Sequence, residues 1–148
     1  MIILIVEDDK VFAGFIEKIV GKWGYKVECA EAGKEAMEKI RKESFDLVLL
    51  DLLLPDCKGY ELIPQFRKLW PGIDVVTMTA YNSRDIEMEV RKQGVVFYMS
   101  KPFSMKQLRT ALAHIRRKKL QYETTHLFTV TVPRMERTLS GICKADVN

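Results

Sequence analysis

The segment LVLLDLLLPD, residues 47–56, places a single carboxylate, Asp51, inside an apolar run. Four apolar residues precede Asp51, and three follow it before Pro55. An ionised carboxylate in apolar surroundings is costly unless another group pairs with it. The near-continuous apolar run before it is typical of a strand that is buried on both faces. We therefore predict a central strand over residues 45–50, with Asp51 at its carboxyl end.

Similar apolar runs recur along the chain, separated by segments with helical spacing. The runs begin about 20 to 28 residues apart, which is typical of alternating strands and helices. Because parallel strands are joined by right-handed crossovers, the pattern predicts an α/β fold with a doubly wound, five-stranded parallel sheet. The expected strands cover residues 2–6, 25–30, 45–50, 73–78 and 95–99.

The composition excludes several other classes of protein. With 148 residues, 47% of them hydrophobic and 30% charged, the chain suits one globular domain with a short extension. No apolar run approaches the roughly 18 residues of a membrane helix, and residues 1–9, MIILIVEDD, lack the basic start of a signal peptide. The three cysteines, Cys29, Cys57 and Cys143, form no CxxC pair. We therefore expect a cytoplasmic protein without a disulfide framework or a zinc site.

The charges are unevenly placed along the chain. Residues 1–113 carry 17 basic and 17 acidic side chains, whereas residues 114–148 carry 7 basic and 3 acidic ones. The main domain therefore has no excess of positive charge, and nucleic acid is not an expected partner.

The alternation of strands and helices stops after about Lys119. Beyond it, HLFTVTVP at residues 126–133 alternates apolar and polar side chains, which predicts one short strand. We expect a domain over residues 1–121 and a C-terminal tail over residues 122–148. The tail is too short for a complete output domain.

Polar side chains follow four of the predicted strands at the points where these strands end. Because the carboxyl ends of parallel strands meet at one edge of a sheet, near which ligands bind, we expect these groups to converge. Asp9 differs from the others, since its place before an apolar helical segment suits a helix N-cap. The residues are Glu7, Asp8 and Asp9 after the first run, Asp51 after the third, Thr79 and Ala80 after the fourth, and Ser100, Lys101 and Pro102 after the fifth.

Carboxylates gathered at this edge would need a cation. Two like charges 4 Å apart repel by about 4 kcal/mol at an effective dielectric constant of about 20. Oxygen ligands without cysteine or histidine favour a hard ion, and a few carboxylates with waters suit Mg²⁺. A metal, the Lys101 amine and the Thr79 hydroxyl around Asp51 would suit phosphoryl transfer, in which the carboxylate attacks while the positive groups hold the phosphoryl oxygens.

Four motifs follow one another along the chain: ED at residues 7–8, DLLLPDCKG at 51–59, TA at 79–80 and KPF at 101–103. Their order closely resembles the receiver domain of two-component response regulators, over about residues 1–120. Asp8 and Asp51 are 43 residues apart, Asp51 and Thr79 are 28 apart, and Thr79 and Lys101 are 22 apart. These spacings fit the family. The resemblance implies a flavodoxin-like sheet with strand order 2-1-3-4-5.

The resemblance also implies how the acidic residues act. Asp51 is the expected phosphoacceptor, which takes a phosphoryl group from a histidine kinase or a phosphotransfer protein. Asp8 and Asp51 would bind Mg²⁺ directly, and Glu7 would bind it through a water molecule. The residue two positions after the phosphoacceptor, here Leu53, would offer its backbone carbonyl to the metal.

The remaining roles concern the phosphoryl oxygens and the response to phosphorylation. The Thr79 hydroxyl and the Ala80 amide are expected beside the phosphoryl group, and Lys101 is expected to pair with it. Thr79 and Tyr98 match the two switch residues, whose side chains turn inward together. The peptide bond between Lys101 and Pro102 is a candidate cis bond.

Two residues depart from the commoner family pattern and leave other functions open. Leu53 is apolar where a polar side chain could orient water, and Tyr81, two residues after Thr79, is bulky. We hypothesise that together they shield the acyl phosphate and slow its loss. One alternative is a metal-dependent phosphatase with an aspartate nucleophile, although that class usually has a second aspartate at the position of Leu53. Another is an interaction module that works without phosphorylation.

The family uses the fourth helix, fifth strand and fifth helix for signalling, here roughly residues 82–119. A homodimer could form through this face or through the tail. We expect no membrane partner, and no enzymatic activity beyond the chain's own phosphorylation and slow dephosphorylation.

Overall fold

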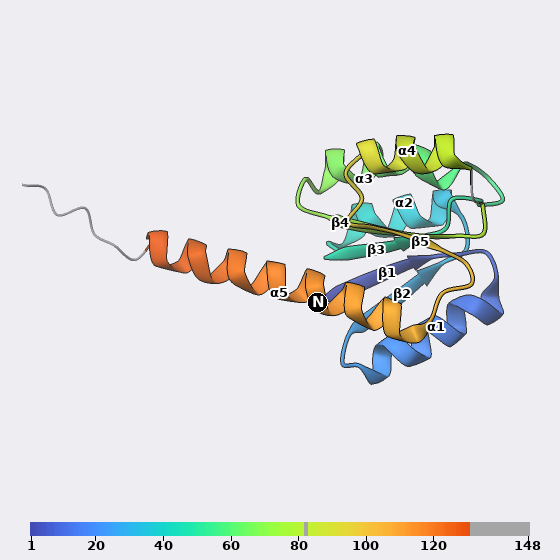
Figure 1. Ribbon diagram of the computed structural model, residues 1–148. Coiled ribbons are helices and arrows are strands. Elements are labelled where there is room, and N and C mark those ends of the chain that lie inside the picture. The colour runs from blue at the N-terminus through green and yellow to red at the C-terminus, as the bar shows by residue number, and fades with distance from the viewer. Residues whose placement is uncertain (82, 131–148) are drawn as a thin grey trace, which may run out of the picture. The chain divides into compact units, whose positions relative to one another are not determined.

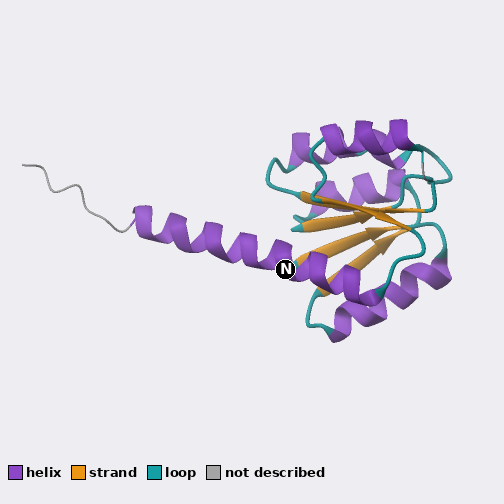
Figure 2. Cartoon of the chain, viewed as in Figure 1, coloured by secondary structure: helices purple, strands orange, loops and turns teal. Residues whose placement is uncertain are grey.

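The five apolar runs of the sequence form the strands of one parallel sheet, with helices on both of its faces (Figure 1, Figure 2). In this computed structural model the described residues are 1–81 and 83–130. The strands are β1 (Ile2–Val6), β2 (Lys26–Ala30), β3 (Leu47–Leu50), β4 (Asp74–Thr79) and β5 (Phe97–Ser100). The helices are α1 (Lys10–Lys22), α2 (Gly33–Lys42), the 3₁₀ turn η1 (Gly59–Glu61), α3 (Ile63–Leu69), α4 (Arg84–Lys92) and α5 (Met105–Val130).

The strand order is β2-β1-β3-β4-β5, and each neighbouring pair is parallel. This finding confirms the predicted fold class and strand order. In the register, Val6 lies beside Leu50, and Leu50 lies beside Thr77. The residues that follow β1 and β3 therefore emerge at the same edge of the sheet.

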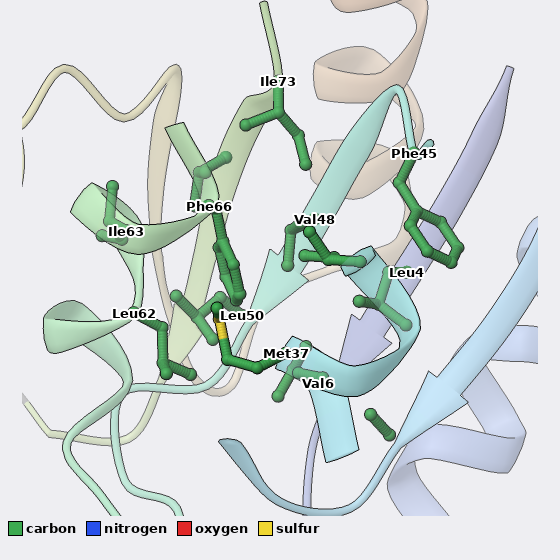
Figure 3. Packing of buried hydrophobic residues seen from close by; sticks show 14 of the residues in the cluster. Leu4, Val6, Met37, Phe45, Val48, Leu50, Leu62, Ile63, Phe66 and Ile73 are labelled. Carbon is green, nitrogen blue, oxygen red and sulfur yellow. The ribbon is translucent and has the colours of Figure 1, made fainter. Parts of the chain in front are cut away.

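Two apolar layers hold the sheet between the helices. One layer packs α2, α3 and α4 against one face, and the other packs α1 and α5 against the opposite face. Figure 3 shows Met37 of α2 and Phe66 of α3 in the same cluster as Val48 and Leu50 of β3. Full burial of a side chain of this size contributes about 1.5–3 kcal/mol. All four residues of β3 are buried, so Asp51 follows a strand that is fixed from both sides.

Helix α1 begins where Asp9 caps it. The Oδ1 atom of Asp9 accepts hydrogen bonds from the backbone N–H groups of Val11 and Phe12, each 3.0 Å long. This confirms Asp9 as the N-cap, an interaction that stabilises a helix by about 1 kcal/mol. The cap also fixes the first turn of α1 directly after Asp8.

Helix α5 includes the start of the segment in which we expected a short strand. Residues 126–130 continue the helix, whereas residues 131–133 lie outside the described part of the chain. A helix satisfies its backbone hydrogen bonds locally, while a lone strand cannot do so without a neighbour. The side chains of Thr124 and Thr125 also bond to carbonyls one turn earlier, those of Leu120 and Gln121. The chain divides into two units after Arg116, and the boundary expected at residue 121 falls within α5.

Over residues 1–81 and 83–130, no helix combines the length and the apolar character needed to cross a membrane. Cys29 and Cys57 are free thiols, and Cys143 lies outside the described residues. Burial raises the pKa of Cys29 and of Cys57 to about 11. Both thiols are therefore protonated at neutral pH and are poor nucleophiles.

Candidate functional site

Three carboxylates meet at the carboxyl edge of the sheet. Glu7 and Asp8 follow β1, and Asp51 follows β3, the strand beside it. One carboxylate oxygen from each of the three lies within 4.8 Å of the other two. Glu7 and Asp51 are buried, whereas Asp8 is exposed. The cluster therefore has a closed side within the fold and an open side at the surface.

Lys101 brings a positive charge to this cluster from the end of β5. Its Nζ atom donates hydrogen bonds to Oε2 of Glu7 at 2.6 Å and to Oδ2 of Asp51 at 3.0 Å. The backbone N–H of Lys101 donates to the carbonyl of Thr79 at 2.8 Å, so the backbone of Lys101 is held at the end of β4. The bond between Lys101 and Pro102 is cis, as the sequence predicts.

The site carries more negative charge than Lys101 can balance. Burial raises the pKa of Glu7, and repulsion from Asp51 adds to this effect, against the hydrogen bond from Lys101. Burial would lower the pKa of Lys101, but its hydrogen bonds with Glu7 and Asp51 outweigh this and raise it. Excess carboxylate charge contributes to both shifts, because it favours binding of a proton at either group, while burial makes the larger contribution at Glu7. A divalent cation would relieve the same imbalance.

The loop after Asp51 is held close against it. The backbone N–H of Leu53 donates to Oδ1 of Asp51 at 3.1 Å, while the Leu53 side chain is 51% exposed. The N–H of Gly59 donates to the carbonyl of Leu52 at 2.8 Å. A Cβ atom at Gly59 would overlap the backbone carbonyl oxygen of Asp51, so this turn has room only for glycine.

A second carboxylate of this loop, Asp56, fixes it to α2. Its two oxygens accept hydrogen bonds from the backbone N–H groups of Gly33 and Lys34, each 2.8 Å long. These bonds lower the pKa of Asp56, with the N–H of Lys34 contributing most. Asp56 thus caps the N-terminus of α2 from a distant part of the sequence. This contact could not be predicted from the sequence, because the residues that it joins are far apart along the chain.

Tyr81 connects the two residues expected to act as switches. The buried Oγ1 of Thr79 accepts a hydrogen bond from the N–H of Tyr81 at 3.1 Å. The hydroxyl of Tyr98 donates to the carbonyl of Tyr81 at 2.9 Å, and the Arg91 guanidinium lies 5.6 Å from the Tyr98 ring centre. Ala80 is exposed at the end of β4. The side chains of Thr79 and Tyr98 therefore both bond to the backbone of Tyr81.

One residue at the site was not predicted as part of it. The ring of Phe12 in α1 lies over Lys101, with Nζ 4.4 Å from the ring centre. In the sequence Phe12 indicates only the apolar face of a helix. Phe12 follows Asp8 by about one helical turn, and this spacing could have indicated that its side chain lies near the site.

The fold and this edge together define a class of protein: a doubly wound α/β domain whose acidic pocket suits a divalent cation. Residues 3–113 match the family described as the response regulator receiver domain, and the chain belongs to this family. Receiver domains are signalling domains of two-component response regulators. They interact with histidine kinases or phosphotransfer proteins, and they bind a divalent metal at an acidic pocket.

Known proteins similar to this chain support the same assignment. The sporulation initiation phosphotransferase F of Bacillus subtilis is 33% identical over 110 residues, which cover 74% of this chain and 89% of that protein. A CheY-like receiver domain protein from Methanospirillum hungatei has a TM-score of 0.75 and 34% identity, with 84% of this chain and 97% of that one covered. The response regulator TrrA from Thermotoga maritima, solved in complex with Mg²⁺-BeF, has a TM-score of 0.70 and 25% identity, with 77% and 97% covered.

Other relatives are much longer than the matched region. The transcriptional regulatory protein ZraR of Klebsiella oxytoca is 37% identical over 118 residues, or 77% of this chain. The chain spans only 27% of that protein. The similarity to ZraR therefore concerns only about a quarter of its length.

Proposed function

We propose that this chain is a phosphorylation-controlled switch in which Asp51 accepts a phosphoryl group from a histidine kinase or a phosphotransfer protein. The observation that carries the proposal is the convergence of Glu7, Asp8 and Lys101 on the carboxylate of Asp51. Asp51 is 7% exposed and pairs with Lys101, while the exposed Asp8 leaves the cluster open at the surface. Its attack as a nucleophile would form an aspartyl phosphate.

The acidic cluster fits Mg²⁺, since it offers carboxylate oxygens from three residues and no sulfur or nitrogen ligand. Asp8 and Asp51 would hold the ion directly, Glu7 through water, and Leu53 through its backbone carbonyl. Bound there, the ion would supply positive charge to the oxygens of the transferred group. Its binding would also relieve the repulsion from Asp51, which adds to the effect of burial in raising the pKa of Glu7.

The side chains around Asp51 then have separate tasks. Lys101 already donates to Asp51 and can pair with a phosphoryl oxygen from the same position. The hydroxyl of Thr79 would leave its bond with the Tyr81 N–H and turn to the phosphoryl group, where the Ala80 amide would join it. Because Tyr98 bonds to the carbonyl of Tyr81, movement of this segment would release the Tyr98 ring. Such a local change of partners can shift a two-state equilibrium.

The signal would be read on the face formed by α4, β5 and α5. Arg67 of α3 donates to the carbonyls of Gln93 and Gly94, so it holds the C-terminal end of α4 to the rest of the domain. Tyr98 bonds to the carbonyl of Tyr81, which precedes α4, and its ring lies against Arg91 in the last turn of α4. A change at Thr79 that moves Tyr81 and Tyr98 would therefore alter the contacts of α4.

Mass spectrometry of the intact chain after treatment with acetyl phosphate and Mg²⁺ tests the proposal. A gain of one phosphoryl group at Asp51 supports it. No gain would favour the alternative of a phosphorylation-independent interaction module. We further propose that the chain acts in the cytoplasm, that residues 1–121 form its receiver unit, and that it has no enzymatic turnover of other substrates.

Leu53 distinguishes a lasting switch from a phosphatase. We expect Leu53→Asn to speed the loss of phosphate from Asp51 roughly tenfold, because a polar side chain can orient the attacking water. Leu53 is 51% exposed, so the change should leave stability nearly unaffected. Time-resolved loss of phosphate from the two proteins gives the rates. Leu69→Asn, at a leucine that is 40% exposed on α3, is the matched control, and equal rates for Leu53→Asn and the wild type would refute the shielding role.

The tail offers a test of self-association. We propose that a homodimer forms through the face of α4, β5 and α5 or through residues 122–148. If the tail contributes, a chain ending at residue 121 will sediment as a smaller species than the full chain at equal concentration. An unchanged association state on deletion would exclude the tail as the dimer contact. The control is the phosphoryl gain at Asp51, which should survive the deletion, because the site lies within residues 7–101.

A further inference from the structure

We propose that Phe12 is a positioning residue, whose ring holds the Lys101 ammonium against Glu7 and Asp51 and thereby promotes phosphoryl transfer to Asp51. The inference rests on the proposed function, because it concerns the same site. It adds a residue outside the four motifs by which the sequence identifies that site.

The position of Phe12 is set by the start of α1. Asp9 caps the helix through the N–H of Phe12 itself, at 3.0 Å, so the backbone of this residue is fixed beside the acidic cluster. On its other side, the ring of Phe103 meets the Phe12 ring edge to face, with 6.0 Å between the centres and 78° between the planes. Aromatic rings prefer such an edge-to-face arrangement. Both ends of the side chain are therefore held.

The contact with Lys101 has the geometry of a cation–π interaction. The Nζ atom lies 4.4 Å from the centre of the Phe12 ring, well inside the limit of about 6 Å. The same nitrogen donates to Glu7 and Asp51, so the ring lies against an ammonium group that has two carboxylate partners. The Lys101 side chain is 20% exposed, and in such a partly desolvated place the attraction is stronger than at an open surface.

The consequence for phosphoryl transfer follows from the flexibility of lysine. A lysine side chain has four rotatable bonds, and without the ring only its two carboxylate partners would hold the ammonium of Lys101 at the site. The negative face of the Phe12 ring favours the ammonium at the site before any phosphoryl group arrives. A preorganised charge of this kind needs no rearrangement during the reaction, which is the reason that it accelerates transfer. An aliphatic side chain of similar size would fill the space without attracting the charge.

The experiment compares rates of phosphorylation by acetyl phosphate with Mg²⁺ present, in the full chain. We expect Phe12→Leu to lower the rate about threefold to tenfold, and Phe12→Tyr to stay within about twofold of the wild type. Phe12 replaced by phenylalanines with one, two and three ring fluorines should give progressively lower rates, since fluorine weakens the negative face without a large change of shape. Phe15→Leu is the matched control, because Phe15 lies on the same helix and is 50% exposed.

A second readout needs no phosphoryl group. The ring current of Phe12 should displace the NMR shifts of the Lys101 Cε protons in the wild type, and Phe12→Leu should remove this displacement. A rate for Phe12→Leu equal to that of the wild type overturns the positioning role, and so does a fluorinated series without a trend, which would leave only a role of shape. If the wild type itself gains no phosphoryl group, the proposed function fails and this role fails with it. The two failures can be distinguished, because the wild type is phosphorylated normally when only the positioning role fails.

Discussion

Replacement of Asp51 by asparagine is expected to abolish phosphoryl incorporation completely. Asparagine has almost the same shape as aspartate, so it can still accept the hydrogen bond from the N–H of Leu53. It lacks the charged oxygen that attacks phosphorus, and an amide is a far weaker nucleophile than a carboxylate. The expected measurement is a mass gain of one phosphoryl group for the wild type after treatment with acetyl phosphate and Mg²⁺, and no gain for Asp51→Asn.

Asp56→Asn is the matched control for this experiment. Asp56 lies in the same loop, five residues on, but its carboxylate bonds to the N-terminus of α2 rather than to Lys101. We expect Asp56→Asn to be phosphorylated as fully as the wild type, with a stability cost of about 1 kcal/mol, because the amide oxygen can replace only one of the two accepting carboxylate oxygens. Phosphoryl incorporation into Asp51→Asn at the rate of the wild type would assign the reaction to another residue and contradict the proposal.

The fold was predictable because its signals are local and repeated. Each strand is a short apolar run, and β1, β3 and β4 are so thoroughly buried that the alternation of polar and apolar residues disappears. The end of the chain was less predictable. The alternating residues after His126 suit a strand by pattern, yet residues 126–130 are helical, since a strand without a neighbour leaves its backbone groups unpaired.

The main part of the site was predictable for a topological reason. In a parallel sheet every strand ends at the same edge, so the sequence alone predicts that Glu7, Asp51 and Lys101 lie close together. The structure confirms their contacts. The functional roles of the wider set, including Thr79 and Tyr98, stay predictions that rest on the family resemblance.

What the sequence could not supply are the contacts that depend on side-chain direction. Phe12 has the ordinary pattern of a buried helical residue, and only the packing of α1 on the sheet shows that its ring lies over Lys101. Asp56 and Gly33 are separated by 23 positions, and no periodicity links them. Tyr81 was predicted to be a shield, yet its backbone also joins Thr79 to Tyr98. The type of a residue does not show which hydrogen bonds its backbone makes.

Replacement of Lys101 by methionine is expected to lower the free energy of unfolding at pH 7 by about 2–3 kcal/mol. The change leaves Glu7, whose side chain is 1% exposed, beside Asp51 without its positive partner. Removing one member of a fully buried ion pair costs about 3–5 kcal/mol, and the 20% exposure of Lys101 reduces this figure. Lys39→Met is the control, since the pair of Lys39 and Glu28 is more exposed, at 30% and 25%, and its loss should cost about 0.5 kcal/mol.

The pH dependence of this loss provides the decisive check. Burial raises the pKa of folded Glu7 above its ordinary value of 4.5, so an ionised Glu7 lowers stability at pH 7. As the pH falls through the folded pKa toward 4.5, Glu7 takes up a proton and this penalty disappears. Urea titrations give the difference in unfolding free energy between Lys101→Met and the wild type. This difference should shrink as the pH falls, while the difference for Lys39→Met should stay nearly constant.

Added Mg²⁺ should also reduce the loss of stability in Lys101→Met at pH 7, because a cation that binds the folded carboxylates replaces the missing charge. A loss independent of both acid and Mg²⁺ would show that Lys101 stabilises the fold by packing alone, and that the carboxylates do not form one electrostatic site.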